Sequence, residues 1–162
     1  MNERDLSVLE DARMLASGAA WSIELQIRRL KSGCCEVESC VMQPFVDFHY
    51  LLIAVGRLEK AAKLAGHVID ISAELKKFKS QLPWLAKLRN AMEHIDDYQL
   101  GHGRDSSVLI RDLHVFACDN ESIDWLGVNV EYKTVVGAAS SLLESIQVEW
   151  ERTTCHSTWT HN

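Results

Sequence analysis

Apolar side chains that recur at steps of three, four or seven residues constrain this chain more than any other feature. A spacing near 3.6 residues is typical of amphipathic helices. Such stripes within residues 2–31 and 132–152 predict two long helices, and shorter ones predict helices that begin near Pro44, Ile71 and Pro83. The clearest stripe consists of Tyr132, Val135, Val136, Ala139, Leu143, Ile146 and Trp150.

One stretch departs from this helical periodicity. Residues 108–118 and 123–130 are rich in β-branched and aromatic side chains, and Asp119-Asn120 between them suits a tight turn. They predict a β-hairpin within residues 107–130. The expected fold is therefore mainly α, an antiparallel bundle of four to five helices with one β-hairpin inserted before the last helix.

The length of the chain, 162 residues, fits one domain. We expect a single helical domain over residues 1–154 and a flexible tail over residues 155–162. Residues 32–40, which lack the apolar stripe, are expected to form a loop between the first two helices.

The composition excludes some classes of protein. No apolar run approaches the roughly 18 residues of a membrane span, so we expect no membrane partner. The first residues show neither the basic patch nor the apolar core of a signal peptide. Five cysteines form an odd set in a chain that is large enough to fold without disulfides. These features predict a cytoplasmic protein with reduced thiols.

The charge is unevenly distributed. The net charge of −6 argues against a general nucleic-acid coat. Residues 57–104 nevertheless carry nine basic and six acidic side chains, whereas the segments on both sides are acidic. An anionic ligand is therefore expected to meet this middle region.

The middle region contains the most informative cluster of polar side chains, at residues 89–97. In a continuous helix, Asn90, His94 and Asp97 fall on one stripe, and Arg89 and Glu93 fall on the adjacent one. The helix would then present a cation, an amide, an imidazole and carboxylates along one edge.

These residue types suit the cleavage of RNA. The planar guanidinium of Arg89 matches phosphate oxygens, and the imidazole of His94 could move a proton at the 2′-hydroxyl or at the leaving 5′-oxygen. Asn90 would orient a reacting group. The 2′-hydroxyl would attack the phosphate without a metal or other cofactor and leave a 2′,3′-cyclic phosphate, so DNA would not be cut.

Two other readings of the same residues stay open. In the first, Arg89 and Glu93 form an ordinary i, i+4 ion pair on a solvated helix; in the second, His94 only hydrogen-bonds its neighbours. A metal site is not expected, because the histidines, cysteines and carboxylates show no recognised ligand spacing.

The pattern Arg89-Asn90-x-x-x-His94, on a late helix of a small helical chain, resembles the motif of the HEPN superfamily of prokaryotic RNase toxins and antiviral nucleases. This resemblance implies a helical bundle and a homodimer in which two copies of the motif build one composite site. It also implies metal-independent endoribonuclease activity, held in check by an antitoxin protein or released in phage defence.

Further candidates flank the motif. Auxiliary roles are expected for Glu93 and Asp97 beside it and for His102 and Arg104 just beyond the helix. An RNA-approach surface is expected from Arg57, Lys60 and Lys87. The alternative hypothesis is a non-catalytic module of the same fold, whose polar edge binds a partner chain or a second copy.

Overall fold

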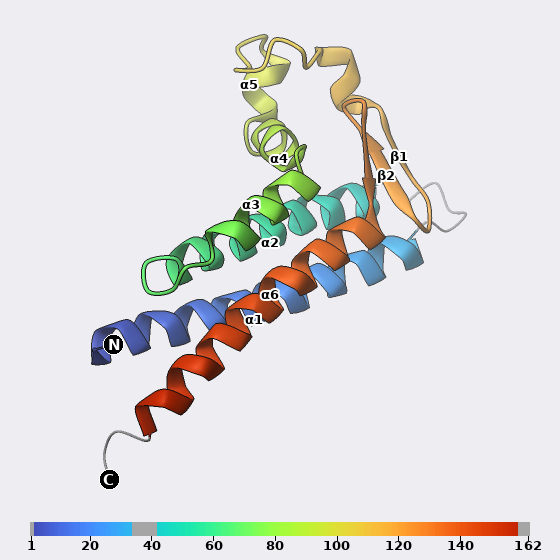
Figure 1. Cartoon of the computed structure of the whole chain (residues 1–162). Coiled ribbons are helices and arrows are strands. Elements are labelled where there is room, and N and C mark those ends of the chain that lie inside the picture. Colours follow the sequence, from blue (N-terminus) through green and yellow to red (C-terminus); the bar gives the residue numbers. More distant parts are fainter. Residues whose placement is uncertain (1, 34–41, 159–162) are drawn as a thin grey trace.

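The mainly helical fold is confirmed by the computed structural model, which describes residues 2–33 and 42–158 (Figure 1). The described residues form six α-helices, a short 3-10 helix called η2 and three strands. In chain order these are α1 (Glu3–Gly33), α2 (Met42–Ala65), α3 (Ser72–Gln81), α4 (Leu85–Glu93), α5 (Ile95–Gln99), η2 (Ile110–His114), β1 (Phe116–Cys118), β2 (Ser122–Trp125), β3 (Val128–Glu131) and α6 (Tyr132–Thr158).

Three long helices, α1, α2 and α6, form the body of the molecule (Figure 1). An ion pair of 3.0 Å between Arg29 Nε and Asp47 Oδ1 joins the end of α1 to the start of α2. Near the other end of α1, the guanidinium of Arg13 lies over the ring of Trp150 in α6, 4.7 Å from the ring centroid. Both neighbours of α1 therefore run antiparallel to it.

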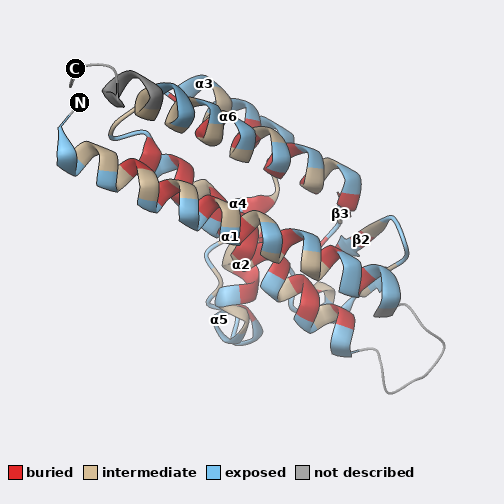
Figure 2. Cartoon of the chain, turned by 90° about the horizontal axis from the view of Figure 1, so that it is seen from below, coloured by how far each residue is buried: buried red, intermediate tan, exposed pale blue. Residues whose placement is uncertain are grey.

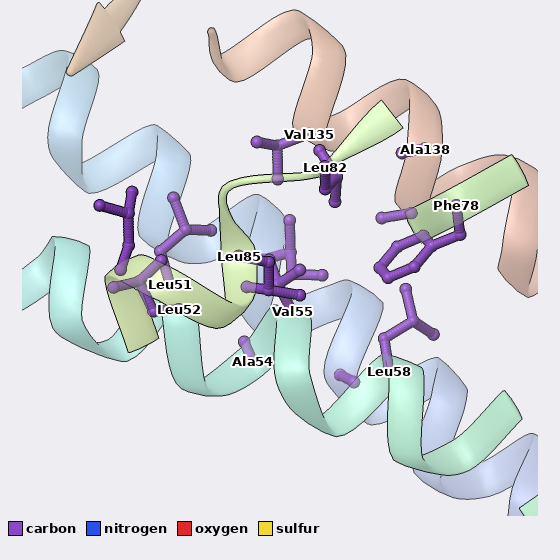
Figure 3. Close-up of a cluster of buried hydrophobic side chains, with 14 of the residues drawn as sticks. Leu51, Leu52, Ala54, Val55, Leu58, Phe78, Leu82, Leu85, Val135 and Ala138 are labelled. Carbon is purple, nitrogen blue, oxygen red and sulfur yellow. The ribbon is translucent and has the colours of Figure 1, made fainter. Parts of the chain in front are cut away.

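The core lies where α2 meets α1, α3, α4 and α6, and Figure 3 shows part of it. Buried residues recur along α1, α2 and α6, the helices that form the body (Figure 2). Helix α2 is apolar around much of its circumference because other helices cover it on several sides. The close-up labels Leu51, Leu52, Ala54, Val55 and Leu58 of α2, with Phe78, Leu82, Leu85, Val135 and Ala138 from the segments around it.

The turn of the predicted hairpin is present, but its strands differ from the prediction. Residues 108–115 form no strand and include η2, and the second predicted strand, residues 123–130, is divided into β2 and β3. The turn from β1 to β2 is held by the Asp119 carboxylate, which accepts backbone hydrogen bonds of 2.7 Å from Glu121 and from Ser122. These bonds hold the pKa of Asp119 below its usual range. The chain then folds back at Leu126-Gly127, where both residues have positive φ angles, 53° and 71°. This lets β3 pair antiparallel with β2 in the order β1-β2-β3.

Aromatic rings attach the sheet to the start of α2. The rings of Phe45 and Phe48 contact those of Phe116 and Trp125 at centroid distances of 5.4 to 6.0 Å. The indole N–H of Trp125 donates to the carbonyl of Leu113 at 3.2 Å, so the ring is buried without losing its hydrogen bond. The sheet therefore packs on the helical body as part of the same core.

Two predicted helix boundaries are wrong. The helix expected from Pro83 onward is not continuous, because α4 ends at Glu93, His94 leaves the helical conformation (φ −125°, ψ 35°), and a short α5 follows. This break gives six helices in place of the four to five expected. Helix α6 runs to Thr158, past the predicted end at Arg152.

Two predicted segments lie partly outside the described residues. Of the loop expected over residues 32–40, the described part, Ser32 and Gly33, is helical, and the rest lies outside. The same is true of residues 159–162 in the expected tail. Within the described ranges, no helix is both long and apolar enough to cross a bilayer.

Candidate functional site

Helix α4 carries the start of the motif and is positioned by its apolar side. Leu85, Leu88, Ala91 and Met92 are buried, and α4 packs chiefly on α2. These residues repeat at the helical spacing of three and four, which leaves Arg89 and Asn90 on the flank of α4, each partly exposed.

Arg89 lies against the backbone of α2 at Gly56. A Cβ atom at residue 56 would be 3.1 Å from Nη1 of Arg89 and 3.4 Å from its Cδ. The missing side chain of this buried glycine thus makes room for the guanidinium. The Arg89 side chain is 33% exposed, so it is held on one side by α2 and open to solvent on the other.

The hydrogen-bonding capacity of Arg89 is incompletely used. Its Nε lies 3.5 Å from Oε1 of Glu93, which confirms the expected ion pair. Nε is nevertheless shielded from solvent and makes no hydrogen bond to any described residue. Because Nε is shielded, an incoming anion would approach the exposed part of the Arg89 side chain.

His94 lies at the break between α4 and α5. Its backbone N–H donates to the carbonyl of Asn90, and its own carbonyl accepts from Tyr98, both at 3.1 Å. Its imidazole is 45% exposed, and Nδ1 lies 3.6 Å from Oδ2 of Asp97. The helix break therefore holds an accessible imidazole beside a carboxylate, an arrangement that suits proton transfer.

Asn90 has a partner that the helical stripe did not predict. Its Nδ2 donates a hydrogen bond of 2.8 Å to the hydroxyl of Tyr98, and the same hydroxyl accepts the backbone N–H of Asp105 at 3.1 Å. Tyr98 is 3% exposed. The hydroxyl of Tyr98 thus links Asn90 of α4 to the loop after α5. The prediction of one continuous polar stripe through Asn90, His94 and Asp97 is wrong, because the helix is broken at His94.

Gly103 completes this connection. A Cβ atom at this position would lie 2.1 to 2.6 Å from three ring atoms of Tyr98, so the loop backbone packs directly on the ring. Gly101, with a φ angle of 77°, makes the turn that leads to it. The segment 101–103 therefore forms a clasp over Tyr98.

The auxiliary candidates occupy different places. Glu93 and Asp97 contact Arg89 and His94, as described. The backbone N–H of His102 donates to the carbonyl of Asp97 at 2.8 Å, which keeps the loop next to α5. Arg104 is exposed.

The candidates for an RNA-approach surface lie on two helices. Arg57 and Lys60 are exposed on α2, and Arg57 directly follows the glycine that contacts Arg89. Lys87, on α4, is close enough to Asp105 to help lower the pKa of that carboxyl, although hydrogen bonds from Ser107 do most of this.

We expect Tyr98→Phe to lower the free energy of unfolding by about 1–2 kcal/mol, because it leaves the partly buried Asn90 amide and Asp105 N–H without their acceptor. Urea denaturation followed by circular dichroism measures this change. Tyr50→Phe is the matched control, since Tyr50 is 55% exposed, and it should change stability by less than about 0.5 kcal/mol. Equal stabilities of the two variants would contradict a structural role for the Tyr98 hydroxyl.

Sequence reasoning missed Gly56, Tyr98 and Gly103. No local signal marks Gly56, because it becomes important only when α4 packs on α2. In the sequence, Gly101 and Gly103 indicate only the end of a helix. The burial of Tyr98 beneath them is visible only in the structure.

Within residues 2–33 and 42–158, no group of three or more histidines, cysteines and carboxylates is gathered as a metal site would require. Comparison with protein-family models, with curated proteins and with solved structures finds no match to this chain. A function for this chain is therefore inferred from the residues of the candidate site.

Proposed function

We propose that this chain is a metal-independent endoribonuclease in which Arg89 binds the scissile phosphate and His94 transfers a proton. The single observation that carries the proposal is the state of Arg89. Its guanidinium is packed against Gly56 on one side, and one-third of the side chain is exposed, so an anion can approach it from solvent. The resemblance of residues 89–94 to the HEPN motif supports the same assignment.

The chemistry balances with these two side chains. The 2′-oxygen attacks phosphorus and loses its proton, the bond from phosphorus to the 5′-oxygen breaks, and that oxygen takes up a proton. Arg89 would stabilise the charge that develops on the phosphate oxygens. One imidazole accepts a proton or donates one in a single event, so two copies of His94 in a homodimer would serve both ends of the reaction.

The partners follow from the same proposal. RNA would approach over Arg57, Lys60 and Lys87, and salt should weaken its binding because these contacts are electrostatic. An uncontrolled ribonuclease damages its own cell, so the proposal includes a protein inhibitor of the antitoxin type. It also includes a role in phage defence and a cytoplasmic location.

The test is cleavage of mixed transfer and messenger RNA by the purified chain in excess EDTA. We expect fragments ending in 2′,3′-cyclic phosphate from the parent, and a rate about 10²–10⁴ times lower from His94→Ala. His67→Ala is the matched control because His67 is exposed in the turn after α2, outside the motif, and it should cleave like the parent. Activity that EDTA abolishes, or that survives in His94→Ala, would contradict the mechanism.

The second candidate is a non-catalytic interaction module. One observation favours it: large apolar side chains, among them Met14 and Trp21, are exposed on the outer side of α1. A folded parent protein that cleaves no RNA would move the assignment to this candidate.

A further inference from the structure

The outer side of α1 carries a regular stripe of side chains that points away from the core. Its members alternate at steps of four and three residues, which is the spacing of a coiled-coil seam. They are Ser7, Asp11, Met14, Gly18, Trp21, Leu25 and Arg28, called the α1 stripe below. All are exposed except Leu25, which is half-buried.

The middle of the α1 stripe is apolar and its ends are charged. Met14 is 62% and Trp21 64% exposed, although α1 already has a separate buried face toward α2 and α6. Contiguous large apolar side chains in water mark interaction surfaces more often than isolated ones do. Asp11 and Arg28 flank them, and neither forms an ion pair with another described residue.

The α1 stripe complements itself when a second α1 lies antiparallel to it. In one register, Asp11 faces Arg28 of the second copy, Met14 faces Leu25, and Gly18 faces Trp21. Each layer occurs twice by symmetry, so both ends gain an opposite-charge pair and both indoles meet a glycine. The matched layers extend over about 26 Å of helix, at 1.5 Å per residue.

A parallel pair would match badly. It would place Asp11 against Asp11, Arg28 against Arg28 and Trp21 against Trp21, while the two Gly18 residues faced each other across a gap. Like charges repel, and unequal layers pack poorly. Charge and size therefore select the same orientation.

Gly18 has the space that this arrangement requires. A Cβ atom there would have no neighbour within 4 Å. The surface beside it is hollowed into a groove of about 640 Å³ between α1 and α2, which includes Met14 and Leu15 on one side and Ala61 and Leu64 on the other. An indole from a second copy would rest over Gly18 at the edge of this groove.

We propose that the α1 stripe is an interface with a second copy of this chain, in antiparallel orientation and in the register that joins Asp11 to Arg28. The proposal rests on the surface of α1 and not on ribonuclease activity.

The test is the dimer dissociation constant of the full chain, measured by analytical ultracentrifugation without RNA. We expect a dimer at micromolar concentration. Asp11→Arg should raise the dissociation constant about tenfold, because two attractive pairs become repulsive. The double variant Asp11→Arg with Arg28→Asp should return it to within about threefold of the parent, since the pairs are restored with exchanged signs.

Two further variants test the apolar layers. Trp21→Ala should weaken the dimer by about 30-fold or more, as expected for a central aromatic anchor. Leu100→Ala is the matched control because Leu100 is 70% exposed at the end of α5, away from α1, and it should have no effect. Circular dichroism checks that each variant is folded.

The possible outcomes separate this proposal from the nuclease. A monomeric parent at 100 μM would overturn the interface, and so would a dimer that Trp21→Ala leaves intact. A dimer that tolerates Asp11→Arg would overturn the register. RNA cleavage by a dimer that Trp21→Ala leaves intact would overturn the interface while supporting the nuclease, and a stripe-dependent dimer that cleaves nothing would do the reverse.

Discussion

Replacing Gly103 by alanine is expected to lower the free energy of unfolding by about 3 kcal/mol, the largest stability effect that we expect from a single added methyl group. The new Cβ would lie 2.1 Å from Cδ1 and 2.3 Å from Cε1 of Tyr98. The ring cannot move aside easily, because it is buried and its hydroxyl accepts hydrogen bonds from Asn90 and Asp105. For a chain of this size the melting temperature should fall by about 6–12 °C.

Gly137→Ala is the matched control for this prediction. Gly137 is exposed within α6, and a Cβ atom there would meet nothing within 4 Å. Alanine favours helix over glycine, so this variant should be about 0.5–1 kcal/mol more stable than the parent. Thermal and urea denaturation measure both variants. If Gly103→Ala were as stable as Gly137→Ala, the clasp over Tyr98 would not exist as described.

Replacing Arg89 by alanine is expected to reduce RNA cleavage by about 10²–10³, because it removes the cation proposed to stabilise the transition state. Stability should change by less than about 1 kcal/mol, since Arg89 is one-third exposed and makes a single long ion pair. The comparison with Glu93→Gln makes this prediction specific. Glu93→Gln removes the same ion pair but keeps the guanidinium against Gly56, so it should retain cleavage within about threefold.

Single-turnover cleavage at saturating RNA distinguishes the two roles of Arg89. If Arg89 served only as the ion-pair partner of Glu93, the two variants would behave alike. A loss confined to Arg89→Ala supports phosphate binding. A loss of the same size in both variants, or in neither, would contradict the role proposed for Arg89.

The helices could be predicted from the sequence because their apolar residues repeat locally. Five of the seven apolar residues that mark the predicted face of the first helix are buried, and two, Leu6 and Ala20, are half-buried. The buried five are Leu9, Ala16, Ile23, Ile27 and Leu30. The same local reasoning found the β1–β2 turn, where Asp119 supplies its own hydrogen-bonded turn. Periodicity and turn chemistry act within a few residues, so a sequence displays them directly.

The features that could not be predicted depend on contacts between distant or unusual residues. The helix breaks at His94 where Tyr98 turns back to reach Asn90 and Gly103, a choice that no local propensity encodes. The third strand requires Leu126 at a φ angle of 53°, which is rare outside glycine, asparagine and aspartate. The helical periodicity of the sequence continues through the break at His94, and the turn at Leu126 lacks the usual sequence signal.

In the candidate site, too, some features are visible in the sequence and others depend on contacts between distant residues. Arg89 and His94 could be chosen because their chemistry is visible in the sequence. The contact of Arg89 with Gly56 could not, since it joins two helices whose mutual position is decided by the whole core. Residue types thus indicate the chemistry, and packing decides which side chain is held for it.

The pairing of α1 with α6 has a consequence for how the protein is made. The two helices lie at opposite ends of the described chain, and Arg13 of α1 contacts Trp150 of α6. During translation α1 leaves the ribosome long before α6 is made, so the part of α1 that packs on α6 stays uncovered until then. A nascent chain in this state presents that part of α1 to chaperones and to other chains, and premature termination before Tyr132 would leave it exposed permanently.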